Sequence, residues 1–223
     1  MKKVKLMRGF TEIKDLWHII QKHNCHIIGG YARYCASPNK YPVKTKDIDI
    51  YCITEENYNN IVEEFKKLGL VEKHSNSKSI TFAKNDLHFV AAPIIQVVKP
   101  IEIGKVKTNG SIDEILDNFD FTIARALIIN ENECLVDDDF EEHEKQKKLV
   151  LKNIHCPVGS LFRCIKYIKK GYFLKPTEAL KLFVEWDSRD TDYKQKLLNF
   201  LLEKNKKDVK NISAIYDLMV AID

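Results

Sequence analysis

The alternating run Asp47-Ile48-Asp49-Ile50 restricts the fold of this chain more than any other stretch of its sequence. β-Branched isoleucines favour a strand, and successive side chains of a strand point to opposite faces. The run therefore predicts a strand over residues 47–54 that buries isoleucines on one face and presents two carboxylates on the other. Two like charges this close are costly without a cation between them, and carboxylate oxygens suit Mg²⁺.

A pair of glycines precedes this strand. A short apolar run typical of a buried strand ends at Gly29-Gly30, where the lack of side chains lets the backbone approach a phosphate. A helix predicted over residues 31–36 would direct its N-terminal amides at the same anion. Arg33, within that helix, and Lys46, just before the first aspartate, are candidates for neutralising phosphate charge.

Each of these motifs is weak when it stands alone, because Gly-Gly is usually a turn and Asp-x-Asp is usually a solvated strand edge. Their order is far more specific. The chain runs through a helix, a strand, Gly-Gly, a helix with an arginine, a loop, and then the strand with the two aspartates.

The remaining periodicity divides the chain into two parts. Further strands are expected over residues 79–83, 87–91, 94–98, 126–129 and 133–136, with a loop or short excursion over 99–110. Helices are expected over residues 11–24, 57–68, 112–119, 140–153, 158–170, 177–187, 191–204 and 208–221. Strands followed by a run of helices indicate an α+β protein. We expect a mixed β-sheet head domain over residues 1–137 and a smaller all-helical domain over residues 138–223.

The glycine and aspartate motifs resemble the head domain of tRNA nucleotidyltransferases (CCA-adding enzymes) and bacterial poly(A) polymerases. A second segment, residues 118–127, looks like the Arg-Asp-Phe-Thr-Ile-Asn-Ala segment of that family. A third, residues 161–167, is similar to the arginine-rich helix that opens the family's neck region. In that helix Ser160, Arg163 and Lys166 stand where the family has arginines. The resemblance implies a nucleotidyltransferase-type head.

The resemblance also implies roles for individual residues. Asp47 and Asp49 would hold the catalytic Mg²⁺ or Mn²⁺ ions. The nucleoside triphosphate would be bound by Gly29, Gly30, Arg33, Lys46, Asp120, Arg125 and Arg163. The expected reaction transfers a nucleoside monophosphate to an acceptor hydroxyl and releases pyrophosphate. The acceptor is an RNA 3′ end, a protein side chain or a small molecule.

Nucleotidyltransferases of this family usually carry a third carboxylate on a later strand, and the chain departs from that pattern. The best-placed position for it, on the strand predicted over residues 94–98, is occupied by Gln96, a neutral side chain that cannot act as a base. Asp86 and Glu102 are other candidates, but both stand in loop-like sequence. Loss of this carboxylate favours a second hypothesis, a degenerate module that binds nucleotide or nucleic acid without catalysis. A third hypothesis is a purely structural interaction protein.

Two further observations limit the function. The acidic-and-arginine motif that reads the incoming base in CCA-adding enzymes is missing, and 223 residues are too few for a full tRNA-binding body, so CCA addition is not expected. The six cysteines include no Cys-x-x-Cys pair, and no apolar run approaches the roughly 20 residues that cross a bilayer. We therefore expect a reduced cytoplasmic protein that binds no membrane.

Overall fold

The structure, a computed structural model, describes residues 1–45, 47–84, 94–103 and 106–205. Its main sheet has five strands in the spatial order β2-β3-β6-β5-β4. These strands are β2 (Cys25–Ile27), β3 (Asp47–Cys52), β4 (Val71–Ser75), β5 (Ser79–Ala83) and β6 (Ile94–Val98). The β3–β6 pair is parallel and the other neighbours are antiparallel, which confirms the expected mixed sheet.

A second sheet continues the first one at the β2 edge. It has the order β1-β10-β9 and is made of β1 (Lys2–Lys5), β9 (Ala126–Ile128) and β10 (Glu133–Val136). An antiparallel bridge between Ile28 and Leu127 connects the two sheets. β9 and β10 pair in antiparallel fashion, so the strands expected over residues 126–129 and 133–136 are confirmed, and they lie beside the strand that leads into the Gly-Gly pair.

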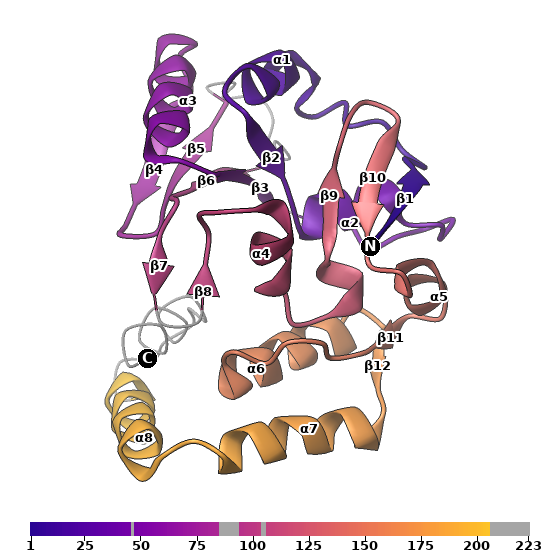
Figure 1. Cartoon of the computed structure of the whole chain (residues 1–223), viewed down its shortest axis with the longest axis vertical. Coiled ribbons are helices and arrows are strands. Elements are labelled where there is room, and N and C mark those ends of the chain that lie inside the picture. The colour runs from indigo at the N-terminus through magenta and orange to yellow at the C-terminus, as the bar shows by residue number, and fades with distance from the viewer. Residues whose placement is uncertain (46, 85–93, 104–105, 206–223) are drawn as a thin grey trace.

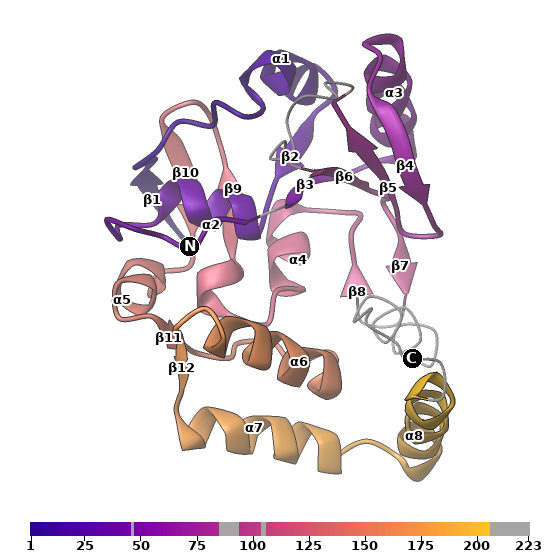
Figure 2. The ribbon, with the colours of Figure 1, turned by 180° about the vertical axis from the view of Figure 1, so that it is seen from behind.

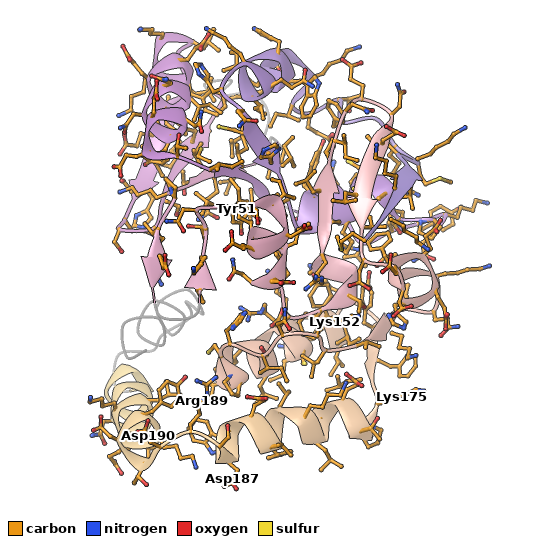
Figure 3. The ribbon with its side chains drawn as sticks, viewed as in Figure 1. Tyr51, Lys152, Lys175, Asp187, Arg189 and Asp190 are labelled. Carbon is orange, nitrogen blue, oxygen red and sulfur yellow. The ribbon has the colours of Figure 1, made fainter. Side chains whose placement is uncertain are left out.

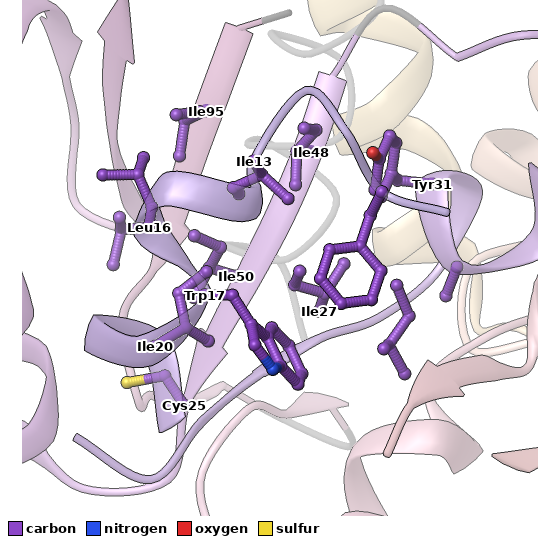
Figure 4. Packing of buried hydrophobic residues seen from close by; sticks show 14 of the residues in the cluster. Ile13, Leu16, Trp17, Ile20, Cys25, Ile27, Tyr31, Ile48, Ile50 and Ile95 are labelled. Carbon is purple, nitrogen blue, oxygen red and sulfur yellow. The ribbon is translucent and has the colours of Figure 1, made fainter. Parts of the chain in front are cut away.

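One face of the main sheet carries the hydrophobic core of the head. Ile48 and Ile50 of β3 are fully buried there, as the alternation of the sequence predicts. They pack with residues of two helices, α1 (Lys14–Lys22) and α3 (Glu55–Lys67), and Figure 4 shows the isoleucines of β3 among the side chains of α1. Burial of this apolar face directs the alternate residues of β3 to the opposite face.

That opposite face is partly covered by α4 (Ile112–Asp117), whose Ser111 forms a capping box with Glu114. Tyr51 of β3, labelled in Figure 3, packs against the buried cluster that includes Ile115 and Leu116. The centroid of its ring lies 5.9 Å from that of Phe119. The strand end that holds Tyr51 is thus covered, and the end that holds the aspartates lies outside this cluster.

The tail is mainly helical, as expected, and packs against the head (Figures 1 and 2). A hydrophobic cluster joins Phe121 of the head to Leu151, Cys164 and Tyr172 of the tail. The proposed domain boundary at residues 137/138 falls between β10 and α5. The elements of the tail are α5 (Phe140–Lys145), β11 (Lys148–Leu149), α6 (Pro157–Ile168), β12 (Phe173–Leu174), α7 (Pro176–Asp187) and α8 (Thr191–Asn205), and they follow a short 3₁₀ turn, η1 (Thr122–Ala124).

Several local predictions are wrong. The helix expected over residues 140–153 ends at Lys145, because Lys147 adopts a left-handed φ of +52° and the chain then forms β11, which pairs in parallel with β12. Residues 99–110, expected to form a loop or short excursion, contain the short antiparallel pair β7 (Glu102–Ile103) and β8 (Val106–Lys107).

The strands β1 and β4 were not predicted, because both have charged sequences and both form sheet edges that are held by a single neighbour. The strand expected over 87–91 and the helix expected over 208–221 lie outside the described residues. In the described part of the chain, no helix is both long enough and apolar enough to pass through a bilayer.

Candidate active site

The two aspartates lie on the face of β3 opposite the hydrophobic core. Asp47 and Asp49 are both partly buried and alternate with fully buried isoleucines. Gln96 on β6 is the direct register partner of Asp49, and partners in a parallel pair point to the same face. Its side-chain nitrogen donates a hydrogen bond to Ser79 Oγ on β5 at 2.7 Å. The position expected for the third carboxylate therefore lies beside Asp49 and is occupied by the neutral side chain of Gln96.

Electrostatics at Asp49 favour a bound cation. Burial of the carboxylate, together with the neighbouring charge of Asp47, raises the pKa of Asp49 to about 7, and the ammonium of Lys166 on α6 acts in the opposite direction. A carboxylate that resists ionisation beside a second carboxylate is stabilised by any positive charge placed between the two.

An Asp49→Asn substitution should stabilise the metal-free protein at about pH 8 and much less at about pH 5. The folded pKa is raised above the unfolded value of about 3.9, so the cost of ionising Asp49 is absent at low pH and complete above about pH 7. After a discount for the partial exposure of the side chain, we expect the stabilisation by Asn to be larger at pH 8 than at pH 5 by a free energy of unfolding on the order of 2 kcal/mol. Urea denaturation at both values measures it, with the exposed Glu56→Gln as control. An equal effect at both values would contradict the burial of Asp49.

The Gly-Gly turn lies directly beside the aspartate strand. The amide of Ile28 donates to the carbonyl of Asp49 at 3.1 Å, which fixes the entry to the turn against β3. On the other side Thr45 Oγ1 bonds the backbone of Asp47, and a Cβ added at Gly30 would stand 3.3 Å from the same oxygen. Motifs that are 17 residues apart in the sequence are thus brought together through backbone contacts.

Gly29 has a conformation that other residues rarely adopt. Its φ is +85°, and it precedes the first residue of α2 (Gly30–Ala36). Its amide donates to the carbonyl of Ala126, and a Cβ at this position would lie 2.9 Å from the ring of Phe119. The glycine is therefore required both by backbone conformation and by the close approach of the partly buried Phe119 ring.

The structure does not bring Arg33 to this face. The side chain is 1% exposed, and its guanidinium donates to Glu144 Oε1 at 3.0 Å, to the Tyr172 hydroxyl at 2.9 Å and to the carbonyl of Val43 at 2.7 Å. Glu144 also accepts a hydrogen bond from Ser37. Arg33 thus joins α2 to the tail, and its contacts do not support the predicted role in holding phosphate. Sequence spacing places it on the right helix but does not reveal which side of that helix it occupies.

Asp120 and Arg163 are paired with each other. The Arg163 Nε lies 2.6 Å from an Asp120 carboxylate oxygen, and Asp120 is almost fully buried, whereas the Arg163 side chain is 30% exposed. The pair connects the segment before η1 to α6. The two residues predicted separately from the second and third sequence segments therefore meet in the structure.

Arg125 has different neighbours. It forms ion pairs with Asp117 at 2.8 Å and with Asp137 at 3.2 Å, and its side chain is 12% exposed. Asp137 lies within 3.8 Å of Lys152 as well. Arg125 thus belongs to a network of ion pairs with Asp117, Asp137 and Lys152. Its contacts therefore do not support its predicted role in nucleotide binding.

Of the alternative third carboxylates, Glu102 does not complete the site. Glu102 is half exposed on β7 and pairs with Lys107 at 3.2 Å. Asp86 and the predicted phosphate ligand Lys46 lie outside the described residues. Among the residues that the structure describes, no three His, Cys, Asp or Glu side chains gather as a metal cluster. Within the described part of the chain, the carboxylates on the exposed face of β3 are therefore Asp47 and Asp49 alone.

Sequence reasoning missed two contributors to this region. Thr45 bonds the backbone of Asp47, and no feature of its surroundings in the sequence marks it. Lys166 acts on Asp49, although the sequence assigned it no role at the carboxylates. The available signal was its spacing of three residues from Arg163, which places both on one side of a helix.

Comparison of the chain with protein families finds one match relevant to this site. A family model described as "Gabija anti-defense 2 family protein" matches residues 1–147. The match includes the glycine pair, both aspartates and Gln96. A comparison with curated proteins finds no match.

Solved structures of CCA-adding enzymes are similar to this chain in fold. One in complex with CTP has 17% sequence identity and a TM-score of 0.56, covering 100% of this chain and 56% of its own. The Thermotoga maritima enzyme complexed with tRNA has 15% identity and a TM-score of 0.54, covering 82% of this chain and 45% of its own. The Bacillus stearothermophilus enzyme with CTP has 14% identity and a TM-score of 0.51, covering 78% and 43%.

These similarities confirm the nucleotidyltransferase-type fold expected from the sequence. At such low identity they show the fold alone. The chain spans about half the length of the CCA-adding enzymes that it matches.

Proposed function

The chain belongs to the Gabija anti-defense 2 family, and we propose that it is a metal-dependent nucleotidyltransferase. It would transfer a nucleoside monophosphate from a nucleoside triphosphate to an acceptor hydroxyl. The observation that carries the proposal is the placement of Asp47 and Asp49 on one face of β3, whose backbone is hydrogen-bonded to the residue before the Gly29-Gly30 turn. A site for metal ions and a turn suited to triphosphate are thereby adjacent.

The oxygen donors of this face suit Mg²⁺ or Mn²⁺. Such hard cations prefer carboxylate oxygens, and Mg²⁺ usually takes one or two of them together with water and substrate phosphates. When bound, the cation would polarise the α-phosphate and offset the charge of the leaving pyrophosphate. Asp47 and Asp49 would be its protein ligands.

The remaining steps follow from the residues around these ligands. The acceptor oxygen bonds to the α-phosphorus while the bond to the oxygen that bridges to the β-phosphate breaks, and pyrophosphate leaves with that electron pair. Gln96 cannot accept the hydroxyl proton. A bound cation would lower the pKa of the acceptor hydroxyl, so its proton would leave to solvent.

Nucleotide binding falls to fewer residues than the sequence implied. We assign the triphosphate to Gly29 and Gly30, and the nucleoside side of the site to the Asp120–Arg163 pair. Arg33 is assigned to the scaffold because its guanidinium is paired with the buried Glu144. Arg125 is assigned to it because its guanidinium is paired with the buried Asp137 and the exposed Asp117. The neighbours solved with CTP and with ATP support a nucleoside triphosphate as the donor.

The family description supports an acceptor within the Gabija defence machinery. A hydroxyl of a protein side chain or of an RNA end in that machinery would be the group modified. Modification of a defence component agrees with an anti-defence role, whereas CCA addition to tRNA would not by itself oppose a defence.

Label transfer tests this function. The purified protein is incubated with Mg²⁺, each nucleoside triphosphate labelled at the α-phosphate, and an extract that contains the Gabija components. We expect label on a macromolecule, lost on chelation of the metal. Removal of the label by protease identifies a protein acceptor, and removal by nuclease identifies RNA.

A second candidate function is nucleotide or nucleic-acid binding without catalysis. The neutral Gln96 beside Asp49 favours it, because the site then has one negative charge fewer than three carboxylates would give. Nucleotide binding that is never accompanied by label transfer, with any acceptor, would support this candidate and contradict catalysis.

A further inference from the structure

Helix α7 exposes an apolar stripe on the face opposite to the one that it buries. Leu180, Phe183 and Val184 are 59%, 68% and 67% exposed, and their spacing of three and four residues places them on one side of the helix. Leu182, on the other side, is buried in the cluster that joins the tail to the head. Figures 1 and 2 show α7 at the end of the molecule remote from the main sheet, beyond α6. Packing within the described part of the chain therefore leaves the stripe uncovered.

The two ends of this stripe carry opposite charges. Lys175 is exposed at the N-cap position of α7, and Asp187 is the last residue of the helix, with a side chain that is 94% exposed (Figure 3). Asp187 follows Leu180 by seven residues and so shares its face. Lys194 approaches this carboxylate only to 3.8 Å. Both charges stand at the helix end where their own helix disfavours them, because a helix dipole favours anions at the N-terminus and cations at the C-terminus.

We propose that this face of α7 is a dimer interface, which binds α7 of a second copy of the chain in antiparallel orientation. A two-fold axis through the centre of the stripe places the apolar side chains of the two copies against one another. It also brings Lys175 of each copy beside Asp187 of the other. The 12 residues of α7 span about 18 Å, so these two ion pairs flank the apolar centre. Each charge then lies at the end of the partner helix whose dipole favours it.

The arrangement of charge favours a second copy over another protein as the occupant. A stripe with one basic end and one acidic end is complementary to itself when inverted, whereas a surface that fits an acidic or a basic partner carries charge of one sign. Lys181, between the two ends, is paired with Glu178 of its own chain at 2.9 Å. An apolar centre with charged residues at its rim is typical of protein interfaces. The inference concerns assembly and does not depend on catalysis by the aspartate face.

Sedimentation equilibrium of the full chain tests the interface, across concentrations from about 1 to about 100 µM. The wild type should approach twice the mass of one chain. Phe183→Asp should weaken self-association by at least about thirtyfold, because it places a charge in the apolar centre of both copies. Met7→Asp is the matched control, since Met7 is as exposed as Leu180 but belongs to the head, and it should leave the association unchanged.

Charge reversal tests the antiparallel orientation. Lys175→Glu or Asp187→Lys alone brings like charges together at both ends of the interface and should weaken self-association by about tenfold. The double variant Lys175→Glu/Asp187→Lys restores opposite charges and should associate within about threefold of the wild type. Such recovery would not follow from a merely local effect of either residue on α7. A wild type that is monomeric throughout the series, a dimer that survives Phe183→Asp, or a double variant as weak as the single ones would overturn the proposal.

Discussion

An Asp49→Asn variant should lose nucleotidyl transfer by about a thousandfold or more. The substitution keeps the shape of the side chain but removes one of two negative ligands, and a metal ion contributes several kcal/mol to stabilising the charge of the transition state. Each 1.4 kcal/mol of that stabilisation corresponds to a tenfold change in rate. The measurement is the initial rate of label transfer at saturating nucleotide.

The fold of this variant can be checked independently. Asp49→Asn removes an ionisation that burial opposes, so the metal-free variant should be at least as stable as the wild type at neutral pH. Glu56→Gln, an exposed carboxylate of α3, is the control and should retain full activity. Retention of activity by Asp49→Asn, with normal folding, would show that this carboxylate does not hold the catalytic metal.

Arg33→Ala should lower the free energy of unfolding by about 3–5 kcal/mol. The substitution leaves Glu144, which is fully buried, without its cationic partner, and a buried unpaired charge is among the costliest defects in a folded protein. Such a loss is a large part of the roughly 5–15 kcal/mol that stabilises an ordinary domain. Chemical denaturation measures it.

The matched comparisons separate charge burial from packing. The double variant Arg33→Met/Glu144→Leu removes both charges and should be much more stable than Arg33→Ala alone. Lys196→Ala breaks an exposed ion pair with Asp192 and should leave the denaturation midpoint unchanged. If Arg33→Ala is as mild as Lys196→Ala, Arg33 does not act as the buried joint between α2 and the tail.

The alternation of charged and branched residues made β3 and its two faces predictable from the sequence. Asp47 and Asp49 share a face because a strand has a period of two, and Ile48 and Ile50 are buried because helices cover the other face. Gly29 could be predicted as a special backbone position, although the approach of Phe119 to it could not. That contact joins residues 90 apart in the sequence.

Other features depend on tertiary partners that local patterns do not specify. Arg33 belongs to a helix whose buried side faces Glu144 and Tyr172, and both stand more than 100 residues later in the chain. The charged strand β4 forms because β5 offers hydrogen bonds to its backbone, whatever its side chains are. Helical periodicity continues past Lys147, but the left-handed backbone there ends the helix.

The central claim is that the two-aspartate face catalyses transfer of a nucleoside monophosphate, and the position of the label in the donor tests it most directly. Parallel reactions contain the same nucleoside triphosphate labelled either at the α-phosphate or at the γ-phosphate, together with Mg²⁺ and the Gabija components. The account predicts that α-label becomes attached to the acceptor while γ-label is released as pyrophosphate, and that Asp49→Asn does neither. Attachment of γ-label, or attachment of α-label that survives Asp49→Asn, would contradict it.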